Sequence, residues 1–184
     1  MRGTWFLTAT VLVAMLAGCA TGTDRTPPVN VSTRSLPAAA SAAAEADTPL
    51  GRAVMTAVNV WRQGKGESAL TTDAVLQRAA AVHAADMVQR DYFGHHNPDG
   101  QGPRERVLAV DPAFSASVSE NIQRLDGAAY TAMSDAALAA VMVEKWAQSP
   151  QHRRIMQAGA ATRSGVGIAR TGTRIIAVQV FAGN

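Results

Sequence analysis

Residues Gly165 to Phe181, with the sequence GVGIARTGTRIIAVQVF, decide the fold of this 184-residue chain. The segment contains two β-like stretches, Gly165 to Arg170 and Arg174 to Phe181, and Gly172 stands between them where a hairpin turn is expected. In the second stretch, both alternating sets of side chains are largely apolar. A strand with this pattern is covered on both faces. The sequence therefore predicts a hairpin with other elements packed on each side of it.

Apolar residues at helical spacing predict the helices that would pack on this hairpin. A loop is expected from Asp91 to Pro103, which is rich in glycine, proline, asparagine and aspartate. The segment from Ser119 to Ile122 is too brief to assign. The predicted helices span about Leu50 to Gln63, Thr72 or Asp73 to Arg90, Arg104 to Ala109, Ser134 to Gln148, and His152 to Met156. Together these elements predict an α+β fold, a three-layer α-β-α sandwich with a small antiparallel sheet flanked by helices.

The start of the chain has the pattern of an export signal. Arg2 precedes an apolar run from Trp5 to Ala17, which is the length of a signal peptide core and short of a membrane-spanning helix. The run ends in Leu16-Ala17-Gly18-Cys19, which resembles the lipobox of bacterial lipoproteins. We expect residues 1–18 to be a lipoprotein signal peptide and Cys19 to be lipidated with diacylglycerol and palmitate. An ordinary secretory signal with a chance cysteine is the alternative.

That resemblance implies a lipid-anchored protein of the cell envelope. Ala20 stands where an inner-membrane retention signal usually has aspartate, which favours the outer membrane in a Gram-negative host, on its periplasmic or surface face. Residues 19–49, rich in Thr, Pro, Ser and Ala, are expected to form a flexible lipidated tether. Residues 50–184 are then long enough for one domain.

Composition narrows the possible partners. Cys19 is the only cysteine, so the chain has no internal disulfide. The net charge is +3 and the basic residues are scattered, whereas a nucleic-acid binder usually shows a basic face. We therefore expect no nucleic-acid partner. Since no long exposed apolar face stands out, we expect a monomer.

Residues suited to acid–base or metal chemistry are few. The chain has four histidines, of which His95 and His96 fall in the predicted loop and His83 lies near the apolar side of a helix. HExxH, GxSxG, P-loop and GxGxxG motifs are absent, which removes the commonest hydrolase and nucleotide-binding classes. From spacing alone, a cluster of histidines with Glu120 and a set of unrelated surface histidines both remain open.

Seven short motifs occur in an order that resembles the bacterial branch of the CAP superfamily. This superfamily includes the cysteine-rich secretory proteins, antigen 5 and the plant pathogenesis-related 1 proteins. Each motif is weak by itself, but together they cover about residues 52 to 182. They are Asn59-x-x-Arg62, His83-Ala-x-Asp86-Met87, Tyr92-Phe93-x-His95 with Pro98-Asp99-Gly100, Glu120-Asn121-Ile122, Trp146-x-x-Ser149-x-x-His152, Gly165-Val166-Gly167, and Val178-Gln179-Val180-Phe181.

The resemblance implies an α-β-α sandwich with a cleft lined by histidines and acidic residues. His95 and His152 match the two cleft histidines, and Glu120 matches the acid of the Glu-Asn-hydrophobic motif. This chain departs from the family at the fourth position, where Ser149 stands in place of a frequent glutamate. Glu144 is near Ser149 in the sequence, but it precedes Trp146, whereas the family's glutamate follows this tryptophan.

Other motif residues are expected to have structural roles. We expect His83 to satisfy a hydrogen bond within the helix packing and Trp146 to lie in the core. Asp86 is expected on a helix surface. His96 should face solvent, and Asp99 should fix a turn through its carboxylate.

Three functions follow from the resemblance. The first is binding of a small ligand, lipid or envelope component in the cleft of His95, Glu120 and His152. The second is a metal-assisted hydrolase of peptidase or esterase type, with those three residues as possible ligands of a divalent metal such as zinc. The same residues could also act as acid and base without a metal. The third is a structural or host-interaction module.

Overall fold

The computed structural model describes residues 35–183. The expected signal peptide 1–18, Cys19 and the first part of the tether lie outside the described residues. Within the described part, no helix has the length and apolarity needed to cross a membrane. The elements in chain order are α1 (Ala38–Ala43), α2 (Pro49–Gln63), β1 (Thr71–Thr72), α3 (Ala74–Gln89), α4 (Pro103–Val110), β2 (Val118–Asp126), α5 (Ala128–Thr131), α6 (Asp135–Gln148), α7 (Pro150–Met156), β3 (Arg163–Thr171) and β4 (Arg174–Ala182).

A four-stranded sheet in the order β1-β3-β4-β2 forms the middle layer. β3 and β4 are the predicted hairpin, with Gly172 in the turn at a positive φ of 54°. β2 pairs antiparallel with the outer side of β4, and the two-residue β1 adds a short parallel pairing to β3. The antiparallel sheet is therefore confirmed, with one brief parallel strand added at its edge.

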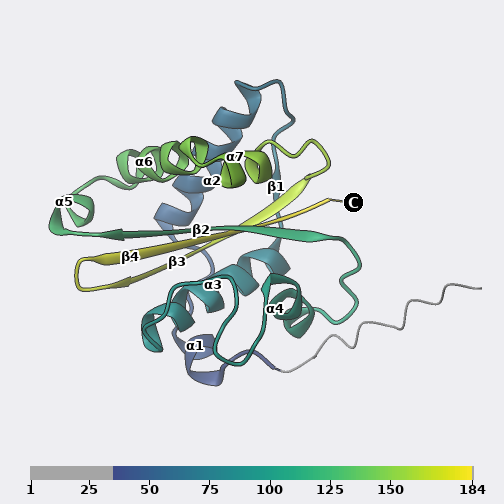
Figure 1. Cartoon of the computed structure of the whole chain (residues 1–184), viewed down its shortest axis with the longest axis vertical. Helices are drawn as coiled ribbons and strands as arrows, with labels where there is room; N and C mark the ends of the chain where they lie inside the picture. Colours follow the sequence, from purple (N-terminus) through teal and green to yellow (C-terminus); the bar gives the residue numbers. More distant parts are fainter. Residues whose placement is uncertain (1–34, 184) are drawn as a thin grey trace, which may run out of the picture. The chain divides into compact units, whose positions relative to one another are not determined.

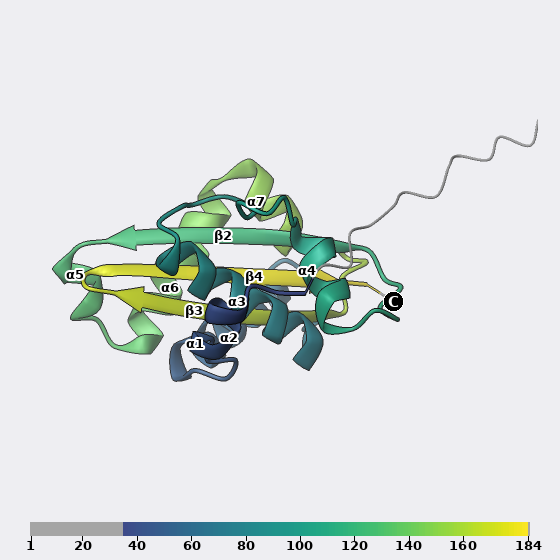
Figure 2. The same cartoon turned by 90° about the horizontal axis from the view of Figure 1, so that it is seen from below.

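Helices cover both faces of this sheet (Figures 1 and 2). α2, α6 and α7 lie on one face and form a core around Trp146 and Phe181. α3, α4 and α1 lie on the other face, with a second core around Met87 and Ile176. All but the first residue of β4 are buried, as the apolar character of both its faces predicts. The α-β-α sandwich is confirmed.

Polar side chains set the beginnings of the two long N-terminal helices. The Asp73 carboxylate accepts hydrogen bonds from the backbone N–H groups of Val75 and Leu76 at 2.9 and 3.1 Å, which caps α3. The hydroxyl of Thr48 accepts from the N–H of Gly51 at 3.0 Å and caps α2, with Pro49 in the first turn. Both helices start within a residue or two of their expected positions.

Residues 35–49 pack on the domain, although they were expected to belong to a flexible tether. Ala40 of α1 is fully buried against Val82 and Ala85 of α3. The side chains of Gln77 and Arg78 donate hydrogen bonds to backbone carbonyls of residues 41, 44 and 46 at 2.7 to 3.3 Å. An isolated helix of six residues is not stable in water, and here its stability comes from this packing.

The segment around Ser119 to Ile122, which the sequence left unassigned, lies within the nine-residue strand β2. The alternation of apolar and polar residues is irregular here because β2 is an edge strand and carries polar side chains inward. Glu120 and Asn121 are both buried, opposite Val180 and Gln179 of β4. Polar inward-facing residues hide a strand from a search for apolar alternation.

Candidate functional site

Glu120 is the centre of a buried polar cluster on the α3–α4 side of the sheet. Its side chain is only 1 % exposed. Oε2 accepts a hydrogen bond from Nη2 of Arg106 at 2.6 Å, and Oε1 lies 2.9 Å from Nδ1 of His95. β2 supplies the carboxylate, α4 supplies the guanidinium, and the loop between α3 and α4 supplies the imidazole.

This environment keeps Glu120 ionised. Burial by itself would raise the pKa of the carboxyl, but the hydrogen bond from His95 and the charge of Arg106 outweigh it and leave the pKa below its ordinary value. A carboxylate accepts and does not donate, so Nδ1 of His95 carries the proton in the bond to Glu120. The Nε2 atom of a neutral His95 is then a hydrogen-bond acceptor.

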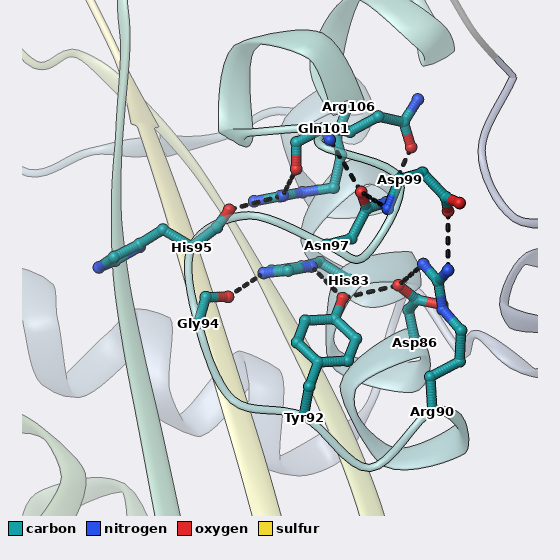
Figure 3. Close-up of polar contacts among 10 residues, drawn as sticks. All are labelled: His83, Asp86, Arg90, Tyr92, Gly94, His95, Asn97, Asp99, Gln101 and Arg106. Atoms are coloured by element: carbon teal, nitrogen blue, oxygen red, sulfur yellow. Dashed lines mark hydrogen bonds and ion pairs between the residues drawn. The ribbon is translucent and has the colours of Figure 1, made fainter.

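The imidazole of His95 is the part of this cluster that reaches solvent. Its side chain is 40 % exposed. Figure 3 shows the ring turned away from the other polar residues of the loop. His95 therefore presents a fixed ring, whose orientation is set from behind by a buried carboxylate.

His152 lies near His95 and is supplied to the site by a different element, the helix α7. Burial lowers the pKa of His152, and the charge of a protonated His95 lowers it further, so the two rings are close enough to repel each other when charged. Asn121 of β2 donates a hydrogen bond from Nδ2 to the backbone carbonyl of His152 at 3.1 Å, which ties α7 to the sheet. The structure thus joins His95 directly to Glu120 and brings His152 into their neighbourhood.

The fourth cleft position remains without an acid. Ser149 ends α6, is half-buried, and makes no capping hydrogen bond with its side chain. Glu144 is exposed, accepts a hydrogen bond from Gln148, and lines a different groove on the α2–α6 side. Glu144 therefore does not replace the missing glutamate.

Arg106 is a site residue that the sequence did not reveal. It is almost completely buried, and besides Glu120 it binds the backbone carbonyls of His95 and Gln101, each at 2.8 Å from Nη1. Arg104 and Arg106 both stand in the predicted short helix, and helical spacing over so few turns does not tell which one points inward. A buried charge of this kind becomes visible only when its partner on another element is located.

The expectations for the neighbouring residues have mixed outcomes. His83 is fully buried and hydrogen-bonded, and Trp146 is in the core, as expected. His96 is exposed, also as expected. The assignment of Asp86 to the helix surface is wrong: it is 2 % exposed and binds both Arg90 and Tyr92.

The interpretation of Asp99 is also wrong. The turn is fixed by Asn97, whose Oδ1 accepts from the N–H groups of Asp99 and Gln101 at 3.1 and 2.8 Å. The Asp99 carboxylate instead accepts from Nη1 of Arg90 at 2.8 Å. Both asparagine and aspartate make such turns, so the sequence offered two equivalent candidates two residues apart.

The described residues do not fit a resident metal ion. Among residues 35–183, no group of three or more His, Asp, Glu or Cys side chains is placed to hold one. Both oxygens of Glu120 are already engaged, and the Arg106 cation that binds one of them would repel a divalent ion. Glu120 therefore supports the orientation of His95 and does not complete a three-ligand set.

Stability is expected to fall between pH 6.5 and pH 4. Burial, followed by the nearby charge of Arg106, lowers the pKa of His83 from 6.5 to about 4. Between these values the unfolded chain binds a proton that the folded protein does not, so the free energy of unfolding decreases as the pH drops, by roughly 3 kcal/mol in total. The Glu120 pKa, lowered from 4.5, adds a further loss once the pH falls below that value.

Urea unfolding at pH 7, 5.5 and 4 measures this dependence. Because His83→Gln has no titrating ring at this position, its stability should change less between pH 6.5 and 4 than that of the wild type. Equal wild-type stability at pH 7 and pH 4 would show that the buried neutral ring of His83 does not cause such a loss.

An apolar groove between α2 and α6 lies on the opposite side of the sheet from Glu120. Its volume is about 590 Å³, within the size range of small-molecule sites. Val60 and Trp61 line it together with alanines of α2 and α6, and Val60 is 64 % exposed.

Comparisons with known proteins agree with this architecture. The family model of the cysteine-rich secretory protein family, CAP, matches residues 55–181. No curated protein matches the chain significantly.

Solved bacterial structures share the fold. An outer surface protein from Borrelia burgdorferi is similar with a TM-score of 0.63 and 18 % identity, over 75 % of this chain and 96 % of that one. An extracellular protein containing an SCP domain from Bacillus anthracis gives a TM-score of 0.60 and 21 % identity, over 73 % of this chain and 40 % of that one. A cysteine-rich secretory protein from Staphylococcus aureus gives a TM-score of 0.55 and 15 % identity, over 73 % of this chain and 38 % of that one.

This chain therefore spans less than half the length of the last two proteins. At these identities the likeness shows the fold, and the activity of those proteins does not transfer with it. The family model covers more than half of the 184 residues, and the likeness to the solved structures agrees with it. The chain belongs to the cysteine-rich secretory protein (CAP) family.

Proposed function

We propose that this protein is a binding module of the cell envelope, which takes a small ligand or envelope component at the surface formed by His95 and His152. The observation that carries this proposal is the half-exposed His95 ring, fixed by a buried ion pair of Glu120 and Arg106. A buried ion pair contributes little net stability, so its position behind His95 favours a role in orienting the ring.

The geometry favours a ligand that carries hydrogen-bond donors. With its Nδ1 proton directed at Glu120, neutral His95 offers Nε2 as an acceptor. Hydroxyl, amide and ammonium groups of lipid headgroups or peptidoglycan fragments would meet this requirement. Of residues 35–183, no serine hydroxyl is hydrogen-bonded to either imidazole, which supports binding over nucleophilic catalysis.

Ligand-dependent thermal stability tests this proposal. Short-chain phospholipids and soluble peptidoglycan fragments serve as probes, and a bound probe at 100 times its Kd should stabilise the domain by about 2.7 kcal/mol, or roughly 5–10 °C in Tm. His95→Ala and His152→Ala should remove the shift. His96→Ala is the matched control, because this exposed neighbour lies outside the cluster and should keep the shift. A shift that survives in His95→Ala, or no shift with either probe class, would contradict the proposal.

A hydrolase is the second candidate, and one observation favours it. A carboxylate bound to Nδ1 of a histidine whose Nε2 is free is the arrangement of a general base. Because the described residues do not fit a metal, this hydrolase would act on water through His95 alone. Hydrolysis of ester or peptide substrates should then be lost in His95→Ala, reduced in Glu120→Gln and unchanged in His96→Ala. Wild-type protein that hydrolyses none of them would remove this candidate.

Attachment to a membrane through Cys19 is part of the proposed function. Several acyl chains on one residue anchor a protein firmly, since each buried methylene contributes about 0.8 kcal/mol. Cys19→Ser should therefore release the protein into the soluble fraction while its circular dichroism spectrum and Tm stay unchanged. Fractionation of cells expressing each form measures this, and membrane retention of Cys19→Ser would contradict the anchor.

A further inference from the structure

Two successive backbone carbonyls fix the chain at His95, and each is held by a different buried side chain (Figure 3). The carbonyl of His95 accepts from Nη1 of Arg106 at 2.8 Å. The carbonyl of Gly94 lies 2.9 Å from Nε2 of His83. The peptide from which the His95 ring projects is therefore held from two directions, by α4 and by α3.

A carboxylate lies behind each of these two side chains. Arg106 is held by Glu120. Behind His83, the hydroxyl of Tyr92 lies 3.2 Å from Nδ1 and donates its hydrogen to Oδ2 of Asp86 at 2.6 Å. Asp86 is itself fixed by Arg90 through a bidentate ion pair. Figure 3 shows this series of contacts leading from Arg90 to Gly94.

The chemistry of these contacts determines the state of His83. A carbonyl oxygen can only accept, so Nε2 of His83 carries the proton that is donated to Gly94. Burial keeps the second nitrogen unprotonated at neutral pH, because it lowers the pKa of the ring to about 4. The ring therefore has one tautomer and one orientation, with its donor directed at the His95 loop.

We propose that His83 is a positioning residue of the His95 site, which fixes the Gly94 carbonyl and thereby the direction of the His95 ring. The Tyr92 ring packs behind it, with the two ring centroids 6.0 Å apart. The inference rests on the function proposed for His95, but it concerns geometry that exists without a ligand. It explains why α3 directs a buried polar side chain at a loop, where a Leu or Met at position 83 would fill the volume equally well.

The tautomer of His95 reports this geometry directly. In the folded protein the Glu120 carboxylate selects the Nδ1–H form, and long-range 1H–15N spectra of histidine-labelled protein distinguish it from the Nε2–H form. His83→Gln places an amide N–H at the position of Nε2 and can still reach Gly94. His83→Asn has the same amide on a shorter side chain and cannot. We expect the ratio of Nδ1–H to Nε2–H at His95 to fall at least tenfold in His83→Asn and to stay near the wild-type value in His83→Gln.

Val82→Ala is the control for loss of stability alone. Val82 is the fully buried neighbour of His83, and it packs with Ala40 of α1 in a separate apolar cluster. The ratio of Nδ1–H to Nε2–H at His95 should be unchanged in Val82→Ala, although the Tm of this variant falls. A ratio that drops in Val82→Ala as well, or that is kept in His83→Asn, would overturn the proposal.

His83→Leu provides a second test should His83→Asn not fold. It fills the volume but has no donor for the Gly94 carbonyl, so a severalfold fall in the same ratio is expected, whereas an unchanged ratio would overturn the proposal. The measurement needs no ligand. Failure of the binding proposal would therefore leave the tautomer result intact, and failure of the positioning proposal would leave ligand-induced Tm shifts in the wild type.

Discussion

Adding one methyl group at Gly167 should destabilise the domain by at least about 4 kcal/mol, a large part of the stability of an average domain. A Cβ at this position would lie 2.2 Å from the carbonyl carbon of Ala80 and from the backbone nitrogen of Ala81. These are backbone atoms of α3, which cannot rotate away as a side chain can. Gly167→Ala therefore forces α3 away from β3 and opens the core packed between them.

Urea denaturation of Gly167→Ala measures this loss. Gly64→Ala is the matched control, since the same methyl group there comes no closer than 3.4 Å to any atom and the backbone φ of −64° suits alanine. The control should stay within about 1 kcal/mol of the wild type. A Gly167→Ala protein as stable as Gly64→Ala would mean that α3 and β3 are not in such close contact.

Replacement of Arg62 by methionine should cost about 3–5 kcal/mol, close to the effect of Gly167→Ala. The guanidinium is fully buried and donates to the backbone carbonyls of Met156 and Ala161 at 2.6 and 3.3 Å. It also donates to the carbonyls of Ser68 and Ala158 at 2.9 and 3.1 Å. Methionine fills the volume but leaves these acceptors without a donor, and each unsatisfied buried acceptor costs roughly 1–3 kcal/mol.

Two further variants separate charge from geometry in this prediction. Arg62→Lys keeps the charge, but one ammonium cannot reach four carbonyls, so most of the loss should remain. Arg52→Met, on the exposed side of the same helix, removes only a surface ion pair with Asp47 and should change the unfolding free energy by less than about 1 kcal/mol. Full stability of Arg62→Lys would show that charge alone is needed there.

Arg62 also illustrates what the short sequence motifs do in this structure. Asn59 and Arg62 stand one turn apart on α2 and hold the loop that follows it, since Asn59 exchanges two hydrogen bonds with the backbone of Leu70 at 2.8 and 2.9 Å. Trp146 donates to the carbonyl of Ile122 at 3.2 Å and so joins α6 to β2. Each motif fixes irregular backbone that apolar packing alone would leave undefined.

Most of the secondary structure could be predicted because it depends on local patterns. The β3–β4 hairpin and the helices α2, α3 and α6 carry long apolar repeats with clear boundaries, and they were found within one or two residues. The segments that were left unassigned, or expected to form at most a transient helix within the tether, lack such a pattern. α1 is a short run of alanines that is stable only against α3, and β2 turns Glu120 and Asn121 inward where apolar side chains are expected.

The candidate site was less accessible to prediction. The resemblance indicated His95, Glu120 and His152, and the structure places the first two in contact and the third nearby. Whether they bind a ligand or act on one stays a prediction. The buried partners that set the protonation and orientation of these side chains, such as Arg106, are arginines and aspartates. The same residue types are common on the exposed faces of helices, so the sequence does not distinguish them.

The order of the elements and the two-sided burial of β4 could be predicted from the sequence. These properties depend on residue type and periodicity along the chain. Only the tertiary structure decided that Asp86 and Arg106 are buried and that Glu120 orients His95 instead of completing a metal site among the described residues. The physical reason is that burial of a charge is tolerated only beside its partner, and these partners stand on separate elements that meet when the sheet and its helices assemble.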